Sequence, residues 1–279
     1  MPKASNGPAS RAPAAAASGD AGAAAAFFDI DNTMMRGASL FHVARQMYRR
    51  GAFQVRDLVN IAAKQARFSL TGEHLKDIQA ARDKALALAT GLLASDIKAL
   101  GEEVYDEIIA SKIWPGTRAL ADQHLRAGRR VWLVSATPVE VAAVIADRLG
   151  LTGALGTVGE IRDGAYTGRL VGEILHGPAK AVAVRELAVR EGLDLGSCWA
   201  YSDSFNDVPL LSLVGNPVAI NPDARLRRYA RERNWPVYDF RSGRRAATLG
   251  LKLATGAGAV YGLWRGARHA FPRQKLPAG

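Results

Sequence analysis

The chain has 279 residues, of which 48% are hydrophobic and 23% charged, so it is long enough for one elaborated globular domain or two small ones. Its single cysteine, Cys198, excludes an internal disulfide and a cysteine-rich zinc site, which agrees with a cytoplasmic protein. The net charge of +11 falls to +3 when the eight basic residues of 241–279 are subtracted, and this nearly balanced body argues against nucleic-acid binding.

Residues 1–23 are rich in Ala, Ser, Gly and Pro and lack the run of large apolar residues that a secretory signal needs. We therefore expect a disordered leader there. Order is expected to begin near Ala24, where an apolar run extends to Phe28 and ends in the polar residues 29–33. This pattern is typical of a buried strand that ends at a functional site.

Further apolar runs follow along the chain, two of them also ending in polar residues. The expected later strands are 131–134, 198–201, 218–220 and 237–240, and the expected helices between them are 117–127, 139–149 and 178–191. Strands that alternate with helices predict an α/β fold with a doubly wound parallel sheet. Ligands bind beyond the carboxyl ends of such strands, and three polar clusters lie there: 29–33, 135–137 and 202–207.

The segment 37–111 lies between the first and second expected strands and is far longer than one crossover helix requires. Ile97, Leu100, Val104 and Ile108 recur at helical spacing after Ser95, which we expect to be the N-cap of that helix. Another helical pattern contains Leu58, Ile61, Ala62 and Gln65. The sequence thus predicts an inserted, all-helical cap. It serves either as a lid over the site or only as a packing appendage.

Paired carboxylates and neighbouring donors suggest phosphate chemistry. Asp29 and Asp31 share one face if they belong to a strand, although such a pair on its own is more often a solvated strand end. Asp203 and Asp207 follow another strand and could complete a magnesium site. Ser135 offers a hydroxyl group, and Lys180, near the start of a helix, offers positive charge to a phosphate.

Four motifs, in order and spacing, resemble those of the haloacid dehalogenase-like (HAD) phosphatases. They are Asp29-Ile30-Asp31-Asn32-Thr33, Ser135, Lys180 and Asp203-Ser204-Phe205-Asn206-Asp207. The helical insertion resembles the cap of the phosphoserine-phosphatase-like branch, subfamily IB. The resemblance covers about residues 24–240 and implies a HAD-like Rossmannoid core over 24–36 and 112–240, with the cap at 37–111.

The resemblance also implies residue roles in a Mg²⁺-dependent phosphomonoester hydrolase. Asp29 would be the nucleophile that forms an aspartyl-phosphate, and Asp31 the general acid and base. The phosphate of a small phosphorylated metabolite would be bound by Thr33, Ser135, Lys180 and Asn206. The metal would be held by Asp29, the Asp31 carbonyl, Asp203 and Asp207, of which Asp207 either binds the ion or orients its ligands.

Two departures from the branch concern the substrate. Phosphoserine phosphatases typically carry a glutamate nine residues after the nucleophile, which binds the substrate's amino group, whereas Ala38 stands here. Ala136 and Thr137 replace the two glycines that usually follow the serine of the second motif. A buried ammonium group without a carboxylate is costly, so a generic phosphatase is favoured over a phosphoserine phosphatase proper. A third alternative is a non-catalytic, membrane-tethered regulatory protein on the same fold.

The basic tail, 241–279, contains a stretch of 19 residues at 246–264 with a single charge, Lys252, and with arginines on both sides. Its length would span a bilayer, but its many small residues make the hydrophobicity marginal. An interfacial helix on an anionic membrane, or a helix docked on the body or on a partner, explains the pattern equally well.

Sedimentation with anionic lipid vesicles tests the membrane interpretation of the tail. If the basic tail binds anionic lipid, the full-length chain will sediment with the vesicles and a 1–240 truncation will stay in the supernatant, because the truncation lacks the basic and apolar residues. Neutral vesicles serve as the control. Identical sedimentation of both proteins would rule the membrane interpretation out.

Overall fold

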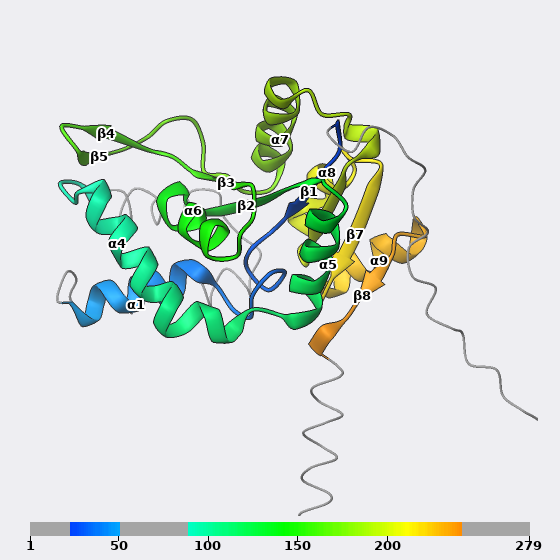
Figure 1. The fold of residues 1–279 in the computed structure, drawn as a ribbon, viewed down its shortest axis with the longest axis horizontal. Helices are drawn as coiled ribbons and strands as arrows, with labels where there is room; N and C mark the ends of the chain where they lie inside the picture. Colours follow the sequence, from blue (N-terminus) through cyan, green and yellow to red (C-terminus); the bar gives the residue numbers. More distant parts are fainter. Residues whose placement is uncertain (1–22, 51–88, 242–279) are drawn as a thin grey trace, which may run out of the picture.

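The structure, a computed structural model, describes residues 23–50 and 89–241 and is built around a six-stranded parallel sheet. The strand order across the sheet is β3-β2-β1-β6-β7-β8 (Figure 1). The strands are β1 Ala25–Phe28, β2 Arg130–Pro138, β3 Gly153–Thr157, β6 Trp199–Ser202, β7 Asn216–Ile220 and β8 Val237–Tyr238. This arrangement confirms the predicted α/β fold and its parallel sheet.

Strand β1 is buried on both faces, which explains its unbroken run of apolar residues. Ala25 and Phe27 point into one hydrophobic core, whereas Ala26 and Phe28 point into the other. Each phenylalanine is fully buried, and burial of such a side chain stabilises the fold by ~1.5–3 kcal/mol. The central strand is therefore held between two layers of helices.

The two cores are covered by helices from different parts of the chain, as a doubly wound sheet requires. Residues of α4 (Ala94–Val104), α5 (Pro115–Arg126) and α6 (Val139–Arg148) contribute to the core on one face. Residues of α7 (Pro178–Glu191), α8 (Val208–Leu211) and α9 (Ala224–Glu232) contribute to the core on the other. The helices predicted at 117–127, 139–149 and 178–191 are confirmed as α5, α6 and α7.

Three strands were missed by the sequence analysis. Strand β3 pairs with β2 at the sheet edge, and the antiparallel hairpin of β4 (Gly159–Arg162) and β5 (Ala165–Leu170) forms a separate two-stranded sheet. The hairpin turns at Asp163-Gly164, where both residues have positive φ values. An Asp-Gly pair is a strong hairpin signal, so this element could have been found in the sequence.

The described part of the insertion after β1 is helical. Helix α1 (Ser39–Arg49) packs beside α4, and both lie at the left of the molecule, away from α9 and β8 (Figure 1). The prediction that Ser95 is the N-cap of this helix is wrong. Helix α4 begins at Ala94, and its N-cap residue, Leu93, makes no side-chain hydrogen bond to the helix. The predicted helical pattern that contains Leu58 and Gln65 lies outside the described residues, so the inserted cap at 37–111 stays a prediction.

A π-helical turn, Tyr105–Ile109, follows α4 and changes which residue faces the core. Ile97, Leu100 and Val104 are buried at the predicted helical spacing, but the next fully buried residue is Ile109. Ile108, which the regular spacing selects, is only partly buried. The wider π-turn advances the inward position by one residue.

The chain reverses its direction of winding at β1 and β6. It passes from β1 to β2 and β3 on one side and later returns to β6, β7 and β8 on the other. Asp29 follows β1 directly, and its N–H donates to the Tyr201 carbonyl of β6 at 3.0 Å. Such a switch point is where open parallel sheets bind ligands, so the fold places Asp29 at the expected site.

The described ranges contain no helix with the length and apolar character needed to cross a membrane. The tail from residue 242 onward lies outside these ranges, as does the leader up to residue 22. The membrane interpretation of 241–279 therefore stays a prediction.

Candidate functional site

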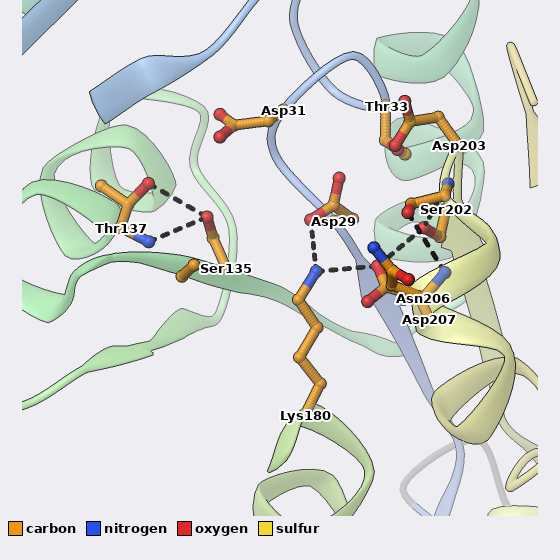
Figure 2. A network of polar contacts seen from close by, with 12 residues as sticks. Asp29, Asp31, Thr33, Ser135, Thr137, Lys180, Ser202, Asp203, Asn206 and Asp207 are labelled. Atoms are coloured by element: carbon orange, nitrogen blue, oxygen red, sulfur yellow. Dashed lines mark hydrogen bonds and ion pairs between the residues drawn. The ribbon is translucent and has the colours of Figure 1, made fainter. Parts of the chain in front are cut away.

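Lys180 joins three elements at the carboxyl edge of the sheet (Figure 2). Lys180 lies in the first turn of α7, and only 3% of its surface is exposed. Its Nζ is 2.5 Å from Asp29 Oδ1 and 2.8 Å from Asp207 Oδ2. A buried ammonium group needs such partners because its transfer from water is otherwise very costly. The structure thus brings Lys180 together with two of the carboxylates that the sequence singled out.

The segment after β6 provides the second group of carboxylates. Ser202 Oγ donates to Asp207 Oδ2 at 2.7 Å, so the same oxygen accepts from both Ser202 and Lys180. Thr33 Oγ1 lies 3.5 Å from Asp203 Oδ1, at the outer limit of a hydrogen bond. Asn206 is exposed and lies on the same side of Lys180 as Asp207 (Figure 2). Ser202 was not predicted as a site residue.

The turn after β1 carries Asp29, Asp31 and Thr33. Strand β1 ends at Phe28, so the two carboxylates do not occupy alternate strand positions as the sequence analysis assumed. Asn32 adopts a left-handed conformation with a φ of 58°, and its carbonyl accepts a hydrogen bond from Asn221 Nδ2 at 3.0 Å. Asparagine tolerates this conformation better than most residues, which favours the turn.

A series of hydroxyl groups connects Asp31 to Ser135. Asp31 Oδ1 accepts from the Ser39 N–H at 2.8 Å and from Ser39 Oγ at 2.6 Å. Ser39 Oγ is 2.6 Å from Thr137 Oγ1, which in turn accepts from Ser135 Oγ at 3.0 Å. Ser135 therefore lies at the predicted edge of the sheet, yet it is connected to Asp31 rather than to Lys180.

Sequence reasoning missed Ser39 and Thr137. Thr137 is two residues after Ser135, and both lie near the carboxyl end of β2. Ser39 starts α1 and is separated from β2 by nearly a hundred residues, with no motif around it. A serine at the first position of a predicted helix was the available signal, but nothing local indicates its tertiary partner.

Burial and like charge perturb the acid groups. Burial, together with repulsion from Asp207 and Asp31, outweighs the attraction of Lys180 and raises the pKa of Asp29 to about 7. Burial and repulsion from Asp29 and Asp207 raise the pKa of Asp203 to about 8. Burial lowers the pKa of Lys180, but its two carboxylate partners raise it by more, so Lys180 stays charged.

The donor set suits a hard cation. Asp29 and Asp207 contact a single ammonium group, and Asp203 lies close enough to interact with all three charges. Burial, with added repulsion among the carboxylates, raises the pKa values of Asp29 and Asp203. Over the described part of the chain, no three acidic or imidazole side chains are arranged to hold a metal ion by themselves. Mg²⁺ usually takes one or two carboxylates and completes its octahedron with waters and substrate phosphate, so this set fits it.

Comparison with known proteins shows which family this chain resembles. The sequence model of the haloacid dehalogenase-like hydrolases matches residues 26–212. The chain is 59% identical over 240 residues to a Mycobacterium tuberculosis protein named phosphoserine phosphatase SerB1, covering 86% of this chain and 78% of that protein. It is 31% identical over 221 residues to a Neisseria meningitidis histidinol-phosphatase, covering 77% of this chain and 98% of that protein.

The fold is also similar to that of solved structures. A Bordetella pertussis protein of unknown function superimposes with a TM-score of 0.68 and is 32% identical in sequence. The superposition covers 78% of this chain and 98% of that protein. The match therefore extends over nearly all of a solved relative.

The raised pKa values predict how metal-free stability depends on pH. Asp29 and Asp203 bind protons in the folded state at a pH where the unfolded chain does not, so unfolding becomes easier as pH rises. Between about pH 6.5 and pH 8.5, in a chelator, we expect the free energy of unfolding to fall by ~1–2 kcal/mol. The midpoint of thermal unfolding, measured by circular dichroism, checks this expectation.

Two histidines act in the opposite direction near pH 6.5, where the unfolded chain still protonates them in part, since the pKa of His124 is lowered to about 4 by burial and by Arg129 and that of His42 is also lowered by burial. Because the unfolded chain binds protons at these two histidines more readily than the folded chain does, they destabilise the fold as pH falls through the ordinary histidine pKa. The control is Asp203→Asn, which should show a shallower dependence. A flat profile for the wild type would contradict the assignment of raised pKa values.

Proposed function

Because this chain belongs to the haloacid dehalogenase-like hydrolases and is a phosphatase of that family, we propose that it hydrolyses phosphomonoesters through an aspartyl-phosphate on Asp29. The observation that carries this proposal is the buried contact of Lys180 with Asp29 and Asp207 at the switch point of the sheet. A buried carboxylate beside a lysine, at the edge where ligands bind, is suited to attack an anionic ester.

In the first step, Asp29 attacks phosphorus while the bond from phosphorus to the ester oxygen breaks. Lys180 contacts Oδ1 of Asp29, so Oδ2 is the oxygen left for the attack. The leaving oxygen takes a proton from Asp31, and the products are an alcohol and the aspartyl-phosphate. In the second step Asp31 accepts a proton from water, the water oxygen attacks phosphorus, and the carboxylate of Asp29 is released with inorganic phosphate.

The phosphate would be bound by groups from all sides of the site. Thr33, Ser135 and Asn206 offer hydrogen-bond donors, and Lys180 balances negative charge on the phosphoryl group and on Asp29. In the described structure the Ser135 hydroxyl donates to Thr137, so it must turn away from Thr137 to reach a phosphate. Donors aimed at the developing charge are the main source of catalysis in phosphoryl transfer.

We propose Mg²⁺ as the cofactor, held by Asp29, Asp203 and the Asp31 carbonyl. When bound, it supplies positive charge that neutralises the phosphate and the carboxylates. Asp207 accepts from Lys180 and Ser202 on Oδ2, which leaves Oδ1 for the ion or for a water on it. The contact between Asp207 and Lys180 favours its role in orienting the other ligands.

The proposed substrate is a small phosphorylated metabolite. Ala38 is exposed at the start of α1 and offers no carboxylate to a substrate ammonium group. Two relatives of more than 30% identity carry different substrate names, which agrees with a scaffold whose leaving-group specificity varies. The similarity to SerB1 supports a phosphoserine phosphatase as the alternative. The non-catalytic alternative is disfavoured, because a site without function has no reason to keep several buried charges.

Release of phosphate from p-nitrophenyl phosphate tests the reaction. We expect turnover with Mg²⁺ and only background rates with a chelator. Asp29→Asn, which keeps the shape but removes the nucleophile, should lower kcat by at least about 10³-fold. The control is Asp147→Asn, the same substitution at an exposed position of α6, which should leave the rate unchanged. Equal background rates for wild type and Asp29→Asn on a broad panel of esters would refute the proposal.

A panel of alkyl phosphates tests the substrate class. Because Ala38 cannot pair with an ammonium group, we expect kcat/KM for phosphoserine to lie within about tenfold of that for esters of similar size that lack the amino group. Initial rates with Mg²⁺ supply the measurement. A preference for phosphoserine of 10³-fold or more would instead establish the phosphoserine phosphatase alternative and require another partner for the amino group.

A further inference from the structure

We propose that Ser39, the first residue of α1, is a positioning residue for this reaction. Its hydroxyl and its N–H hold Oδ1 of Asp31, so that Oδ2 is the oxygen that exchanges a proton with the leaving group. The inference rests on the proposed function, because it assigns a partner to the acid and base of that reaction. Since Ser39 belongs to the insertion at 37–111, the insertion would then take part in the reaction, in addition to any role as a lid.

The contact between Ser39 and Asp31 is short, double and buried. Oδ1 accepts the Ser39 N–H at 2.8 Å and the Ser39 hydroxyl at 2.6 Å, and Ser39 is fully buried. Hydrogen bonds to a charged acceptor are shorter and stronger than neutral ones. Among the described residues, no other side chain or backbone N–H donates to the Asp31 carboxylate.

The same contact also stabilises the start of helix α1. The first N–H groups of a helix have no partner within it, and Ala38 at the N-cap position supplies no side-chain acceptor. The carboxylate of Asp31, from the turn after β1, fills this role instead. Negative charge is also favoured at the positive end of a helix, so the contact stabilises the helix start and fixes the carboxylate.

The directions of the hydroxyl hydrogens follow from the donation of Ser39 Oγ to Asp31 Oδ1, because a hydroxyl group has one hydrogen to give. Ser39 must therefore use its one hydroxyl hydrogen toward Asp31. At the 2.6 Å contact between Ser39 and Thr137, Thr137 is then the donor, and Ser135 donates to Thr137 in turn. All three hydroxyl groups point toward Asp31, and Ser39 is the only one of them that touches it.

This arrangement makes the two carboxylate oxygens of Asp31 different, because only Oδ1 accepts hydrogen bonds from Ser39. An oxygen that already accepts two hydrogen bonds is the less basic of the pair, so a proton on Asp31 resides on Oδ2. The Asp31 side chain is only partly buried and is turned toward the side of the site that holds Thr137 and Ser135 (Figure 2). Without Ser39 the carboxylate is free to rotate, and proton transfer loses rate when the donor leaves its geometry.

Leaving groups of different acidity separate positioning from general structure. A p-nitrophenolate ion departs with little help from a proton, whereas an alkyl oxygen depends on it. We expect Ser39→Ala to lower kcat/KM at least about tenfold for an alkyl phosphate such as glycerol phosphate, and less than about threefold for p-nitrophenyl phosphate. The ratio kcat/KM is used because it covers only the steps up to release of the leaving group.

Two further variants support the measurement. Ser39→Thr keeps the hydroxyl and should restore most of the rate with the alkyl phosphate. Ser111→Ala removes a serine hydroxyl of the same insertion that binds only the Ile108 carbonyl, and it should change neither rate. If Ser39→Ala does not fold, as judged by circular dichroism, Ser39→Cys takes its place, because its thiol fills similar space but donates weakly.

Equal losses with both phosphates would overturn the proposal and leave Ser39 a structural residue, as would unchanged rates with both. Neither outcome affects the proposed function, which is judged by wild type against Asp29→Asn on p-nitrophenyl phosphate. Conversely, if wild type shows no turnover of any ester, the reaction itself fails before Ser39 is tested. The two failures are therefore distinguishable.

Discussion

The buried ammonium group of Lys180 is the constraint on which the rest of the site depends. It lies between Asp29 and Asp207, which come from the segments after β1 and β6, and it is carried by the first turn of α7. A charge in this position is tolerated only if both carboxylates stay in contact with it. The loops after two strands and the start of α7 are therefore fixed relative to one another by one side chain.

A second connection ties the insertion to the same edge. Ser39 at the start of α1 contacts Asp31 in the turn after β1 and Thr137 near the end of β2. Lys180 thus joins the core elements to one another, whereas Ser39 joins the core to the helices inserted in it. A movement of α1 relative to the sheet would change the surroundings of Asp31 directly, while the pair of Asp29 and Lys180 would remain in place.

Much of this could be predicted from sequence because the signals are local. Strand β1 is an unbroken apolar run, and Asp29, Asp31, Asp203 and Lys180 stand in motifs at strand ends or helix starts. Ser39 could not be predicted, because its role depends on a contact with Thr137 that the fold creates from distant segments. Two local predictions also failed. Ser95 was expected as the N-cap, but α4 starts at Ala94, and helical spacing selected Ile108, but a π-turn turns Ile109 inward instead.

The charge balance of the site has a consequence for the order of binding. Asp29, Asp203 and Asp207 oppose one Lys180, and a phosphomonoester brings about two more negative charges at neutral pH. Burial is the main cause of the raised pKa values of Asp29 and Asp203, and repulsion among the carboxylates adds to it before any substrate enters. A phosphate dianion would add to that repulsion unless a cation or protons arrived first. On the proposed mechanism, a divalent cation would bind before or together with the ester, since protonation of Asp29 would remove the proposed nucleophile.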